Sequence, residues 1–378
     1  MSPWRRKPTA DRFADAPLDG PLLDVDGVRT YFKTPRGLVR AVDGVSLTLE
    51  RGKTLGVVGE SGSGKSVLLR SIMGLLPNNV ERHGSIKFEG REIGESGTDV
   101  MRAYWGTQMS MVFQDPMTSL NPVMKIGKQI TEPLRYHLDV SRDYAEDTAL
   151  ALLQSVGIPE AERRLEEYPH QLSGGMRQRV MIAIALACGP KLLFADEPTT
   201  ALDVTVQAQI LDLLHKQQSE RFMAMVLVTH DLGVVAGRAE STAVMYAGRV
   251  VEFAPTRELF NATRHPYTEA LLKSIPKLSQ ASHTRLEAIV GRPPDLVDPP
   301  VGCKFAARCP YAQPRCLEEE PALTDAEMPG HAYRCFYPVG TEAGKRALAD
   351  NLAAGVTAAG LPVGTAATTS ETATTVVV

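Results

Sequence analysis

Hydrophobic positions along the chain alternate between strand-like and helix-like patterns. They predict two longer strands near the start of the patterned sequence, then three short and almost wholly apolar strands, the first of which leads into a helix-like run. The predicted strands are Leu22–Val28, Ala41–Leu49, Thr54–Val58, Leu192–Ala195 and Ala224–Thr229, and the helix-like run is Val67–Leu76. Apolar strands of this kind are buried on both faces, which indicates an α/β fold.

The same pattern divides the chain into four parts. Residues 1–20 have no sustained periodicity, which predicts a disordered leader, and residues 21–255 carry the strands and helices of the main body. Residues 256–340 form a region rich in Pro and Cys. Residues 341–378 are mostly Ala, Thr, Gly and Val, which predicts a low-complexity disordered tail with one short helix at Lys345–Ala354.

Composition and charge exclude few classes of protein. The chain has 378 residues, 43% hydrophobic and 22% charged, which suits two or three globular domains. A net charge of −3 with no dense basic block disfavours a protein that coats nucleic acid. The longest apolar stretch, Val180–Cys188, is far shorter than the roughly 20 residues that cross a bilayer. We therefore expect neither a membrane span nor a signal peptide.

A glycine-rich loop follows the predicted strand Thr54–Val58. Its sequence, GESGSGKS, matches the Walker A pattern with Gly59, Gly64, Lys65 and Ser66, and Ser61, Gly62 and Ser63 complete the loop. Glycines let backbone N–H groups wrap around phosphate oxygens at a helix N-terminus, which favours anions. Lys65 is expected to reach the β- and γ-phosphates and Ser66 to ligate Mg²⁺. The alternative, a glycine turn before an ordinary helix, is disfavoured by the flanking strand and helix.

Acidic and imidazole side chains follow the other two apolar strands. Asp196 and Glu197 end the strand Leu192–Ala195, as in a Walker B motif, and His230 follows Ala224–Thr229. We expect Asp196 to hold Mg²⁺, Glu197 to act as general base on the attacking water, and His230 to orient that water. Surface acids after a buried strand, or an inert histidine, are the alternatives for each motif taken alone.

A second phosphate-binding edge is predicted at the sequence LSGGM. Ser173, Gly174 and Gly175 precede a helix-like run, so their backbone N–H groups and one hydroxyl are available to an anion. One nucleotide has no evident use for two such edges in a single compact domain. This edge is therefore expected to serve a nucleotide held by another subunit.

These motifs together resemble the ATP-binding cassette (ABC) ATPases, whose signature sequence is LSGGQ. Met176 departs from the glutamine of that signature, while the serine and both glycines remain. The resemblance covers about Leu22–Pro255. It implies a P-loop nucleotide-binding domain with a RecA-like core, an antiparallel β subdomain and a helical signature subdomain at about residues 116–190.

Three further roles are implied by this resemblance. Gln114 matches the Q-loop glutamine, which contacts Mg²⁺ or water and links the ATP site to the helical subdomain. Asp203 matches the D-loop that crosses the dimer interface. Phe32 resembles the A-loop aromatic that stacks on adenine, with Tyr31 as the other candidate and a plain core aromatic as the alternative.

Longer strings are similar to one branch of the family, the ATPase subunits of bacterial oligopeptide, dipeptide and nickel importers. These strings are GESGSGKS, MVFQDPMTSLNP, LSGGMRQRVMIAIAL and DEPTTALDVTVQAQIL, together with the HPYT of His265–Thr268. Locally, HPYT predicts a capped turn before a helix. The branch implies an ATPase that couples hydrolysis to uptake of peptides, with nickel or another small solute as the alternative cargo.

The same branch implies partners and a location. We expect a second, related ATPase subunit or a second copy of this chain, two membrane permease subunits, an external solute-binding protein and no nucleic acid. The subunit would lie at the cytoplasmic face of the bacterial membrane. A soluble ABC ATPase of DNA repair or translation is the alternative from another class, and it lacks support because the chain has one cassette and neither a long coiled coil nor an inserted zinc module.

Four of the five cysteines lie close together in the C-terminal part of the sequence. Cys303, Cys309, Cys316 and Cys335 are spaced unlike zinc ribbons or ferredoxin runs, so spacing alone names no metal. Clustered thiols in a reducing compartment favour metal ligation over disulfides. Resemblance to peptide-importer subunits implies a 4Fe-4S cluster, with zinc or free thiols as the alternatives.

Overall fold

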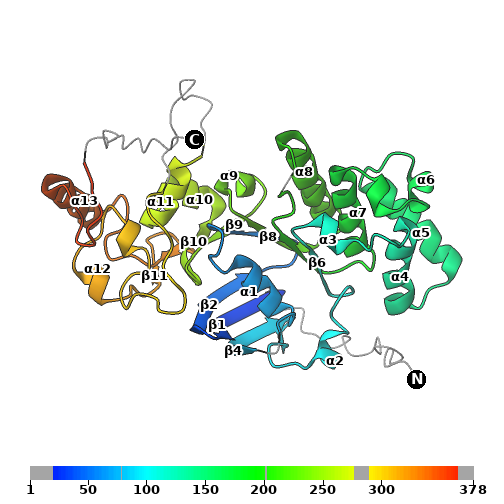
Figure 1. Cartoon of the computed structure of the whole chain (residues 1–378), viewed down its shortest axis with the longest axis horizontal. Coiled ribbons are helices and arrows are strands. Elements are labelled where there is room, and N and C mark those ends of the chain that lie inside the picture. Colours follow the sequence, from blue (N-terminus) through cyan, green and yellow to red (C-terminus); the bar gives the residue numbers. More distant parts are fainter. Residues whose placement is uncertain (1–19, 78, 201, 276–288, 365–378) are drawn as a thin grey trace, which may run out of the picture.

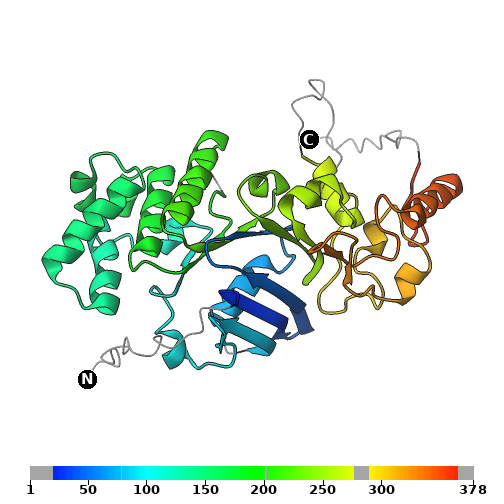
Figure 2. The same ribbon diagram turned by 180° about the vertical axis from the view of Figure 1, so that it is seen from behind.

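The computed structural model describes residues 20–77, 79–200, 202–275 and 289–364 (Figure 1). Two sheets occupy the middle of the molecule. Helices α4, α5 and α6 lie at one end, and the C-terminal region lies at the other, as Figure 2 shows from behind. The leader predicted over residues 1–20 falls almost entirely outside the described residues.

The larger sheet has eight strands in the order β11-β12-β10-β9-β3-β8-β7-β6. Its parallel part consists of β6 (Met109–Val112), β7 (Leu192–Asp196), β8 (Ala224–Thr229), β3 (Thr54–Val58) and β9 (Ser241–Tyr246), and β10 (Arg249–Pro255) adds to it in the antiparallel sense. Residues of β3, β7 and β8 are buried throughout, as their apolar sequences predict. Parallel strands bring their carboxyl ends to one edge of the sheet.

The smaller sheet is antiparallel, in the order β2-β1-β4-β5. It contains β1 (Leu23–Thr34), β2 (Gly37–Leu49), β4 (Val80–Phe88) and β5 (Arg91–Glu92). Strand β1 extends well beyond the predicted end at Val28. Its register shifts between Val25 and Arg29, so the two-residue alternation breaks there although the pairing with β2 continues to the hairpin.

Several helices connect and cover these sheets. They are α1 (Lys65–Ile72), α2 (Thr98–Met101), α3 (Pro116–Ser119), α4 (Ile126–Leu138), α5 (Arg142–Ser155), α6 (Ala161–Leu165), α7 (Gly174–Leu186), α8 (Val204–Glu220) and α9 (Leu232–Val235). Strand β7 divides two cores. Leu193 and Ala195 contribute to the core shared with α4, α5 and α7, whereas Leu192 and Phe194 contribute to the core shared with α1 and the smaller sheet.

The C-terminal region extends the larger sheet. It contains α10 (Thr256–Asn261), α11 (Pro266–Lys273), α12 (Arg315–Glu318), β11 (Thr324–Asp325), β12 (Ala332–Tyr333) and α13 (Glu342–Ala354). Because β12 pairs with β10, the sheet crosses the boundary expected at residue 255. The turn predicted from HPYT is present: the ring of His265 accepts a hydrogen bond from the N–H of Tyr267 and caps α11.

The short helix predicted at Lys345–Ala354 is present as α13, whereas the disorder predicted for the rest of residues 341–364 is not what the structure shows; residues 365–378 lie outside the described part. Helix α13 is capped by Thr341. Its Asn351 side chain is buried and donates hydrogen bonds to the carbonyls of Pro310 and Ala312. Composition could not reveal this docking, because it depends on a segment about 40 residues earlier in the chain. Nowhere in the described ranges is there a helix long and apolar enough to cross a membrane.

Candidate active site

The loop between β3 and α1 has no room for side chains at two of its glycines. A Cβ at Gly59 would lie 2.2 Å from the carbonyl oxygen of Met245, and one at Gly64 would lie 2.2 Å from that of Ala41. Gly64 also has φ of 102° and caps α1 without a side-chain hydrogen bond. The first N–H groups of α1 are therefore available to a ligand. Ser61 and Gly62 are exposed at the tip of the loop.

Lys65 lies inside this loop and is 4% exposed. Its Nζ donates hydrogen bonds to the carbonyl oxygens of Gly59 (2.7 Å) and Glu60 (3.0 Å), and lies 3.7 Å from Glu197 Oε1. Burial lowers the pKa of Lys65, and the nearby carboxylates of Glu197 and Asp196 counter that shift. The ammonium group of Lys65 is therefore held inside the loop, in a position where it can also pair with a phosphate group.

Ser66 and Asp196 meet at the edge of the sheet, where Ser66 Oγ donates a hydrogen bond of 2.8 Å to Asp196 Oδ1. Burial raises the pKa of Asp196, and the bond from Ser66 opposes that shift. Next to them, the hydroxyl of Ser63 is buried and has no partner. A hydroxyl and a carboxylate are oxygen ligands suited to Mg²⁺, and the unpaired Ser63 hydroxyl suits a phosphate oxygen, so the residues fit Mg²⁺ and a nucleotide.

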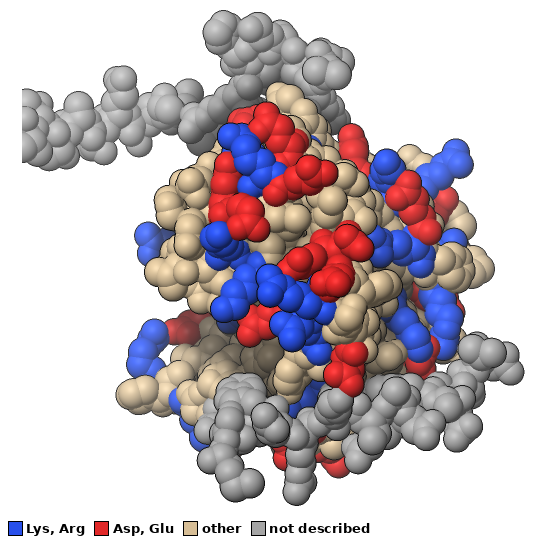
Figure 3. Space-filling model, turned by 90° about the vertical axis from the view of Figure 1, so that its right-hand side faces the viewer, with Lys and Arg blue, Asp and Glu red and all other residues tan. Residues whose placement is uncertain are grey.

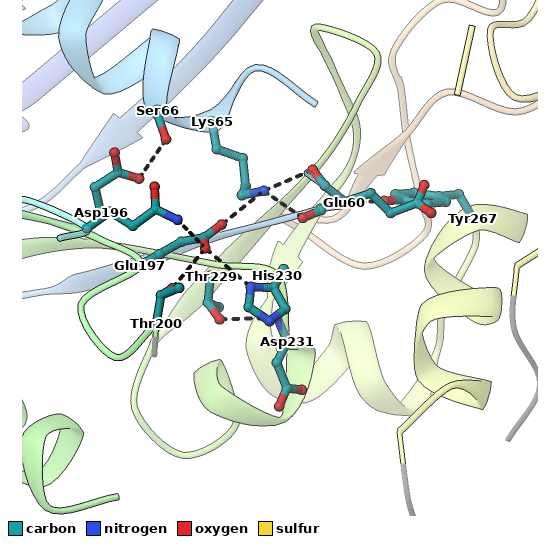
Figure 4. A network of polar contacts seen from close by, with 12 residues as sticks. Glu60, Lys65, Ser66, Asp196, Glu197, Thr200, Thr229, His230, Asp231 and Tyr267 are labelled. Atoms are coloured by element: carbon teal, nitrogen blue, oxygen red, sulfur yellow. Dashed lines mark hydrogen bonds and ion pairs between the residues drawn. The ribbon is translucent and has the colours of Figure 1, made fainter. Parts of the chain in front are cut away.

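Glu197 is the centre of the polar network (Figure 4). Its Oε2 accepts hydrogen bonds from Gln114 Nε2 (3.2 Å) and Thr200 Oγ1 (3.1 Å), and lies 3.4 Å from His230 Nδ1. The residue has φ of 44°, a left-handed conformation that costs an L-residue roughly 1–2 kcal/mol. In this conformation the carboxylate of Glu197 lies 3.7 Å from Lys65 Nζ.

The arrangement is suited to proton transfer beside a phosphate. The side chain of Glu197 is 14% exposed and that of His230 is 62% exposed, so the carboxylate is sheltered while the imidazole faces solvent. Sequence reasoning assigned no role to Thr200, although its hydroxyl stands three residues after Glu197 in DEPTT. Gln114, which follows β6, reaches the same carboxylate because β6 and β7 are parallel neighbours.

The second predicted phosphate edge lies apart from this network. Ser173 and Gly174 are exposed, and the Ser173 hydroxyl accepts a hydrogen bond from Met176 N as the cap of α7. Within the described residues, no hydrogen bond joins this edge to Lys65 or Glu197. Asp203 is nearby instead: it caps α8 through Val206 N, and a Cβ at Gly175 would lie 2.9 Å from Val206.

The two candidate A-loop aromatics are neighbours on β1, and both are half-buried. The hydroxyl of Tyr31 donates a hydrogen bond of 2.5 Å to Asp43 Oδ1. Burial, and then that bond, raise the pKa of Tyr31 to about 12. Phe32 has no hydroxyl to hold it in this way, and its ring remains the proposed adenine contact.

The expected iron-sulfur or zinc site at the four cysteines is wrong. In the part of the chain that the structure describes, no group of three or more His, Cys, Asp or Glu side chains is arranged to hold a metal ion. Cys303, Cys309, Cys316 and Cys335 border one small apolar cavity with several aromatic rings. Burial raises the pKa of all four thiols, that of Cys303 to about 11.

Two family models match the chain. Residues 42–200 match the model described as ABC transporter, and residues 251–316 match the model described as oligopeptide/dipeptide transporter, C-terminal region. The first covers the Walker A loop, Gln114, the signature edge and the Walker B residues. The second covers HPYT and three of the four clustered cysteines.

Named relatives are similar over most of the chain. The oligopeptide transport ATP-binding protein OppD of Salmonella typhimurium is 48% identical over 318 residues, which cover 84% of this chain and 94% of that protein. OppD of Bacillus subtilis is 50% identical over 304 residues, covering 80% and 85%. Among solved structures, a dimeric post-hydrolysis state of the ATP-binding cassette MJ0796 bound to ADP and Pi has a TM-score of 0.56 and 29% identity, covering 62% of this chain and 99% of that one.

Proposed function

Because the chain belongs to the family of ABC transporter ATP-binding subunits, we propose that it drives the uptake of oligopeptides or dipeptides by a bacterial importer. The chain is an ATPase of this class. One observation carries the choice of cargo: residues 251–316 match the C-terminal region of oligopeptide/dipeptide transporters, outside the part common to ABC ATPases. The relatives named for oligopeptide transport favour peptide over nickel.

The proposed catalytic residues are Glu197, His230 and Gln114. Glu197 takes the proton of the attacking water, because its carboxylate is sheltered and lies beside the phosphate loop. Gln114 and His230 both face Glu197 Oε2 and hold that water in line. Since phosphoryl transfer depends mainly on positioning and charge, no covalent step on the protein is needed.

The proposed ATP-binding residues surround the phosphate chain. Backbone N–H groups of the loop and the start of α1 bind phosphate oxygens, and Lys65 neutralises their charge. Ser66 and Asp196 would hold Mg²⁺, with Gln114 as a further proposed ligand, and the ion would supply further neutralisation of phosphate charge. The residues proposed to contact ATP are Phe32, Gly59, Ser61, Gly62, Ser63, Gly64, Lys65, Ser66, Gln114 and Asp196.

The signature edge is proposed to close the ATP site of a second cassette. Ser173, Gly174 and Asp203 are exposed, Gly175 is half-buried, and Val204 next to Asp203 is 82% exposed. An apolar side chain in that position suits a protein interface. The related cassette MJ0796 is itself described as dimeric with ADP and Pi bound. The partner is a related ATPase subunit or a second copy of this chain.

A groove beside α4 is the proposed contact for the membrane permease subunits. Its volume is about 540 Å³, and Trp105, Met124, Tyr136 and Ile184 are among its lining residues. Val123 at 82% and Met117 at 64% exposure lie on the segment between Gln114 and α4. Two permease subunits, supplied by an external binding protein, would place this subunit at the cytoplasmic face of the membrane.

A role on nucleic acid is not supported by the charge distribution. Figure 3 views the end formed by α4, α5 and α6, where Lys and Arg alternate with Asp and Glu. Ion pairs join Arg142 to Glu146 and Lys125 to Glu166 on these helices. On this face of the described residues the basic side chains therefore lie next to acidic ones, which does not favour binding of a phosphate backbone there.

Copurification and turnover test the proposal together. The full chain, extracted from membranes with mild detergent, should carry two multi-span proteins, and a peptide-loaded binding protein should increase its ATP hydrolysis in the reconstituted complex. Nickel in place of peptide should not increase it. Recovery with ribosomes or DNA, and without membrane proteins, would overturn the proposal.

A further inference from the structure

The C-terminal region contacts the phosphate-binding loop through Glu60, the second residue of that loop. Arg308 donates two hydrogen bonds to its carboxylate, from Nη1 to Oε2 (2.6 Å) and from Nη2 to Oε1 (2.9 Å). The two residues are 248 positions apart, and the Arg308 side chain is only 3% exposed. A two-pronged pair of this kind fixes orientation as well as distance.

Arg308 is itself held by neighbours that do not involve the loop. Its Nε donates to the carbonyl of Val290 (2.9 Å), Nη2 donates to that of Ile289 (3.3 Å), and Nη1 donates to the hydroxyl of Tyr246 (3.3 Å). The guanidinium group also lies 5.8 Å from the centre of the Tyr246 ring. Glu60 therefore meets a positively charged group that is held independently of the loop, by backbone carbonyls of the C-terminal region and by Tyr246 of β9.

Tyr267 of the HPYT sequence makes the second contact to Glu60. Its hydroxyl accepts a hydrogen bond of 2.8 Å from the backbone N–H of Glu60, and Figure 4 shows the ring beside that residue. Tyr267 is fully buried and packs on Tyr246 and Phe305, with ring centres 4.6 and 5.3 Å away. The turn capped by His265 thus fixes the hydroxyl of Tyr267 where it can accept the hydrogen bond from the N–H of Glu60.

The third polar group of Glu60 faces the catalytic lysine, because its carbonyl oxygen accepts a hydrogen bond from Lys65 Nζ. Glu60 is therefore joined to Arg308, Tyr267 and Lys65 at once. We propose that the C-terminal region positions the phosphate-binding loop through Glu60, with Arg308 and Tyr267 as positioning residues for Lys65. This inference rests on the proposed function as an ATPase and assigns a task to the region that distinguishes peptide-type subunits.

A separate contact from the same segment supports this proposal. Lys304 is 8% exposed and donates a hydrogen bond of 3.1 Å to Asp43 Oδ2. Asp43 in turn accepts the hydroxyl of Tyr31, which lies next to the proposed adenine contact Phe32. Residues 304–308 thus contact the phosphate loop directly through Arg308, and they reach β1 indirectly, through Asp43 of β2.

The test compares tyrosine-to-phenylalanine variants of the full-length chain. Tyr267→Phe keeps the packed ring and removes the acceptor for Glu60. Tyr311→Phe is the matched control, because its hydroxyl donates to Glu269 in the same region and touches no part of the loop. Titration calorimetry with Mg-ATP gives the Kd, and circular dichroism gives the Tm of the ligand-free chain.

Tyr267→Phe should weaken ATP binding about fivefold and Arg308→Met about tenfold or more, as expected for a neutral and a charge-assisted hydrogen bond. Arg308→Lys should recover only part of the affinity, because an ammonium group cannot form the two parallel bonds. Tyr311→Phe should bind as the wild type does.

Wild-type affinity in both Tyr267→Phe and Arg308→Met would overturn the inference. So would equal losses of affinity and Tm in Tyr267→Phe and Tyr311→Phe, since they would show general loosening of the region. Failure of the wild-type chain itself to bind ATP would instead refute the proposed function, and is distinguishable for that reason.

Discussion

Gly59–Ser66 and Ser173–Gly175 both place serine and glycine at the start of a helix, but only the first is completed by its own chain. Around the first, Lys65 is enclosed and Ser66 meets Asp196 from another strand. At the second, Ser173 is exposed, and within the described residues its hydroxyl bonds only to Met176 N of its own helix. Similar local sequences are thus found in two different settings: one is surrounded by residues from other strands of the same chain, and the other is exposed on the surface.

The two edges differ in how far each is preorganised in the absence of nucleotide. Buried contacts hold the residues of the first edge in place, so ATP can bind to a single subunit there. The second edge is exposed, and within the described residues it makes no hydrogen bond to Lys65 or Glu197. We therefore propose that hydrolysis needs both edges and that another cassette supplies the second.

Among the substitutions at these two edges, Glu197→Gln should cause the largest loss of ATP hydrolysis. The variant removes the proton acceptor and keeps the shape, so hydrolysis should fall about 1,000-fold while ATP affinity stays near that of the wild type. Phosphate release measures the first quantity and nucleotide titration the second. Turnover near the wild-type rate would remove Glu197 from its assigned role.

Ser173→Arg should distinguish the role of the signature edge from that of the phosphate-binding loop. A bulky cation on the exposed edge blocks the second cassette, so hydrolysis should fall about 100-fold with no change in ATP binding by the single chain. Ser141→Arg is the matched control, because Ser141 caps α5 by the same kind of bond to Tyr144 N. Equal losses in both variants would show that capping, and not the edge, is responsible.

Asp43→Asn should lower the free energy of unfolding of the chain by about 2 kcal/mol, because it leaves the buried ammonium group of Lys304 without the Asp43 carboxylate. Burial alone would raise the pKa of Asp43, but the bond from Tyr31 and the charge of Lys304 lower it from 3.8 to about 2. The carboxylate therefore stabilises the fold above pH 3.8, and this contribution is lost as the pH falls toward 2.

Denaturation of wild type and Asp43→Asn at several pH values measures that contribution. The difference in unfolding free energy between the wild type and Asp43→Asn should have its largest value at pH 5 and should decrease as the pH falls toward 2. A gap that stays constant over this range would mean that the Asp43 charge does not stabilise the fold.

Gln114→Ala should have the smallest effect. The hydrogen bond to Glu197 and the proposed contact with the attacking water are lost, so hydrolysis should fall about tenfold while ATP affinity falls much less, because the loop and Lys65 still hold the phosphates. Steady-state rates at saturating ATP would show it. A loss as large as that of Glu197→Gln would mean that Gln114 does more than position the carboxylate.

Local sequence was sufficient where contacts are local. The order of strand, glycine loop and helix at Thr54–Ile72 follows from adjacent residues, as does the cap at His265. The contact between Glu60 and Arg308 could not be predicted, because it joins residues 248 positions apart. The iron-sulfur cluster expected at the four cysteines came from family resemblance and not from their spacing, and it was wrong, because the described residues hold no group of side chains arranged for a metal ion.

The central claim is that a second cassette completes the ATP site. Sedimentation of the Glu197→Gln chain, alone and mixed with the ATPase subunit that copurifies with it, tests this most directly. With Mg-ATP the mass should double in one of the two samples, and Ser173→Arg should abolish the doubling. A chain that binds ATP and stays a single cassette in both samples would contradict the account.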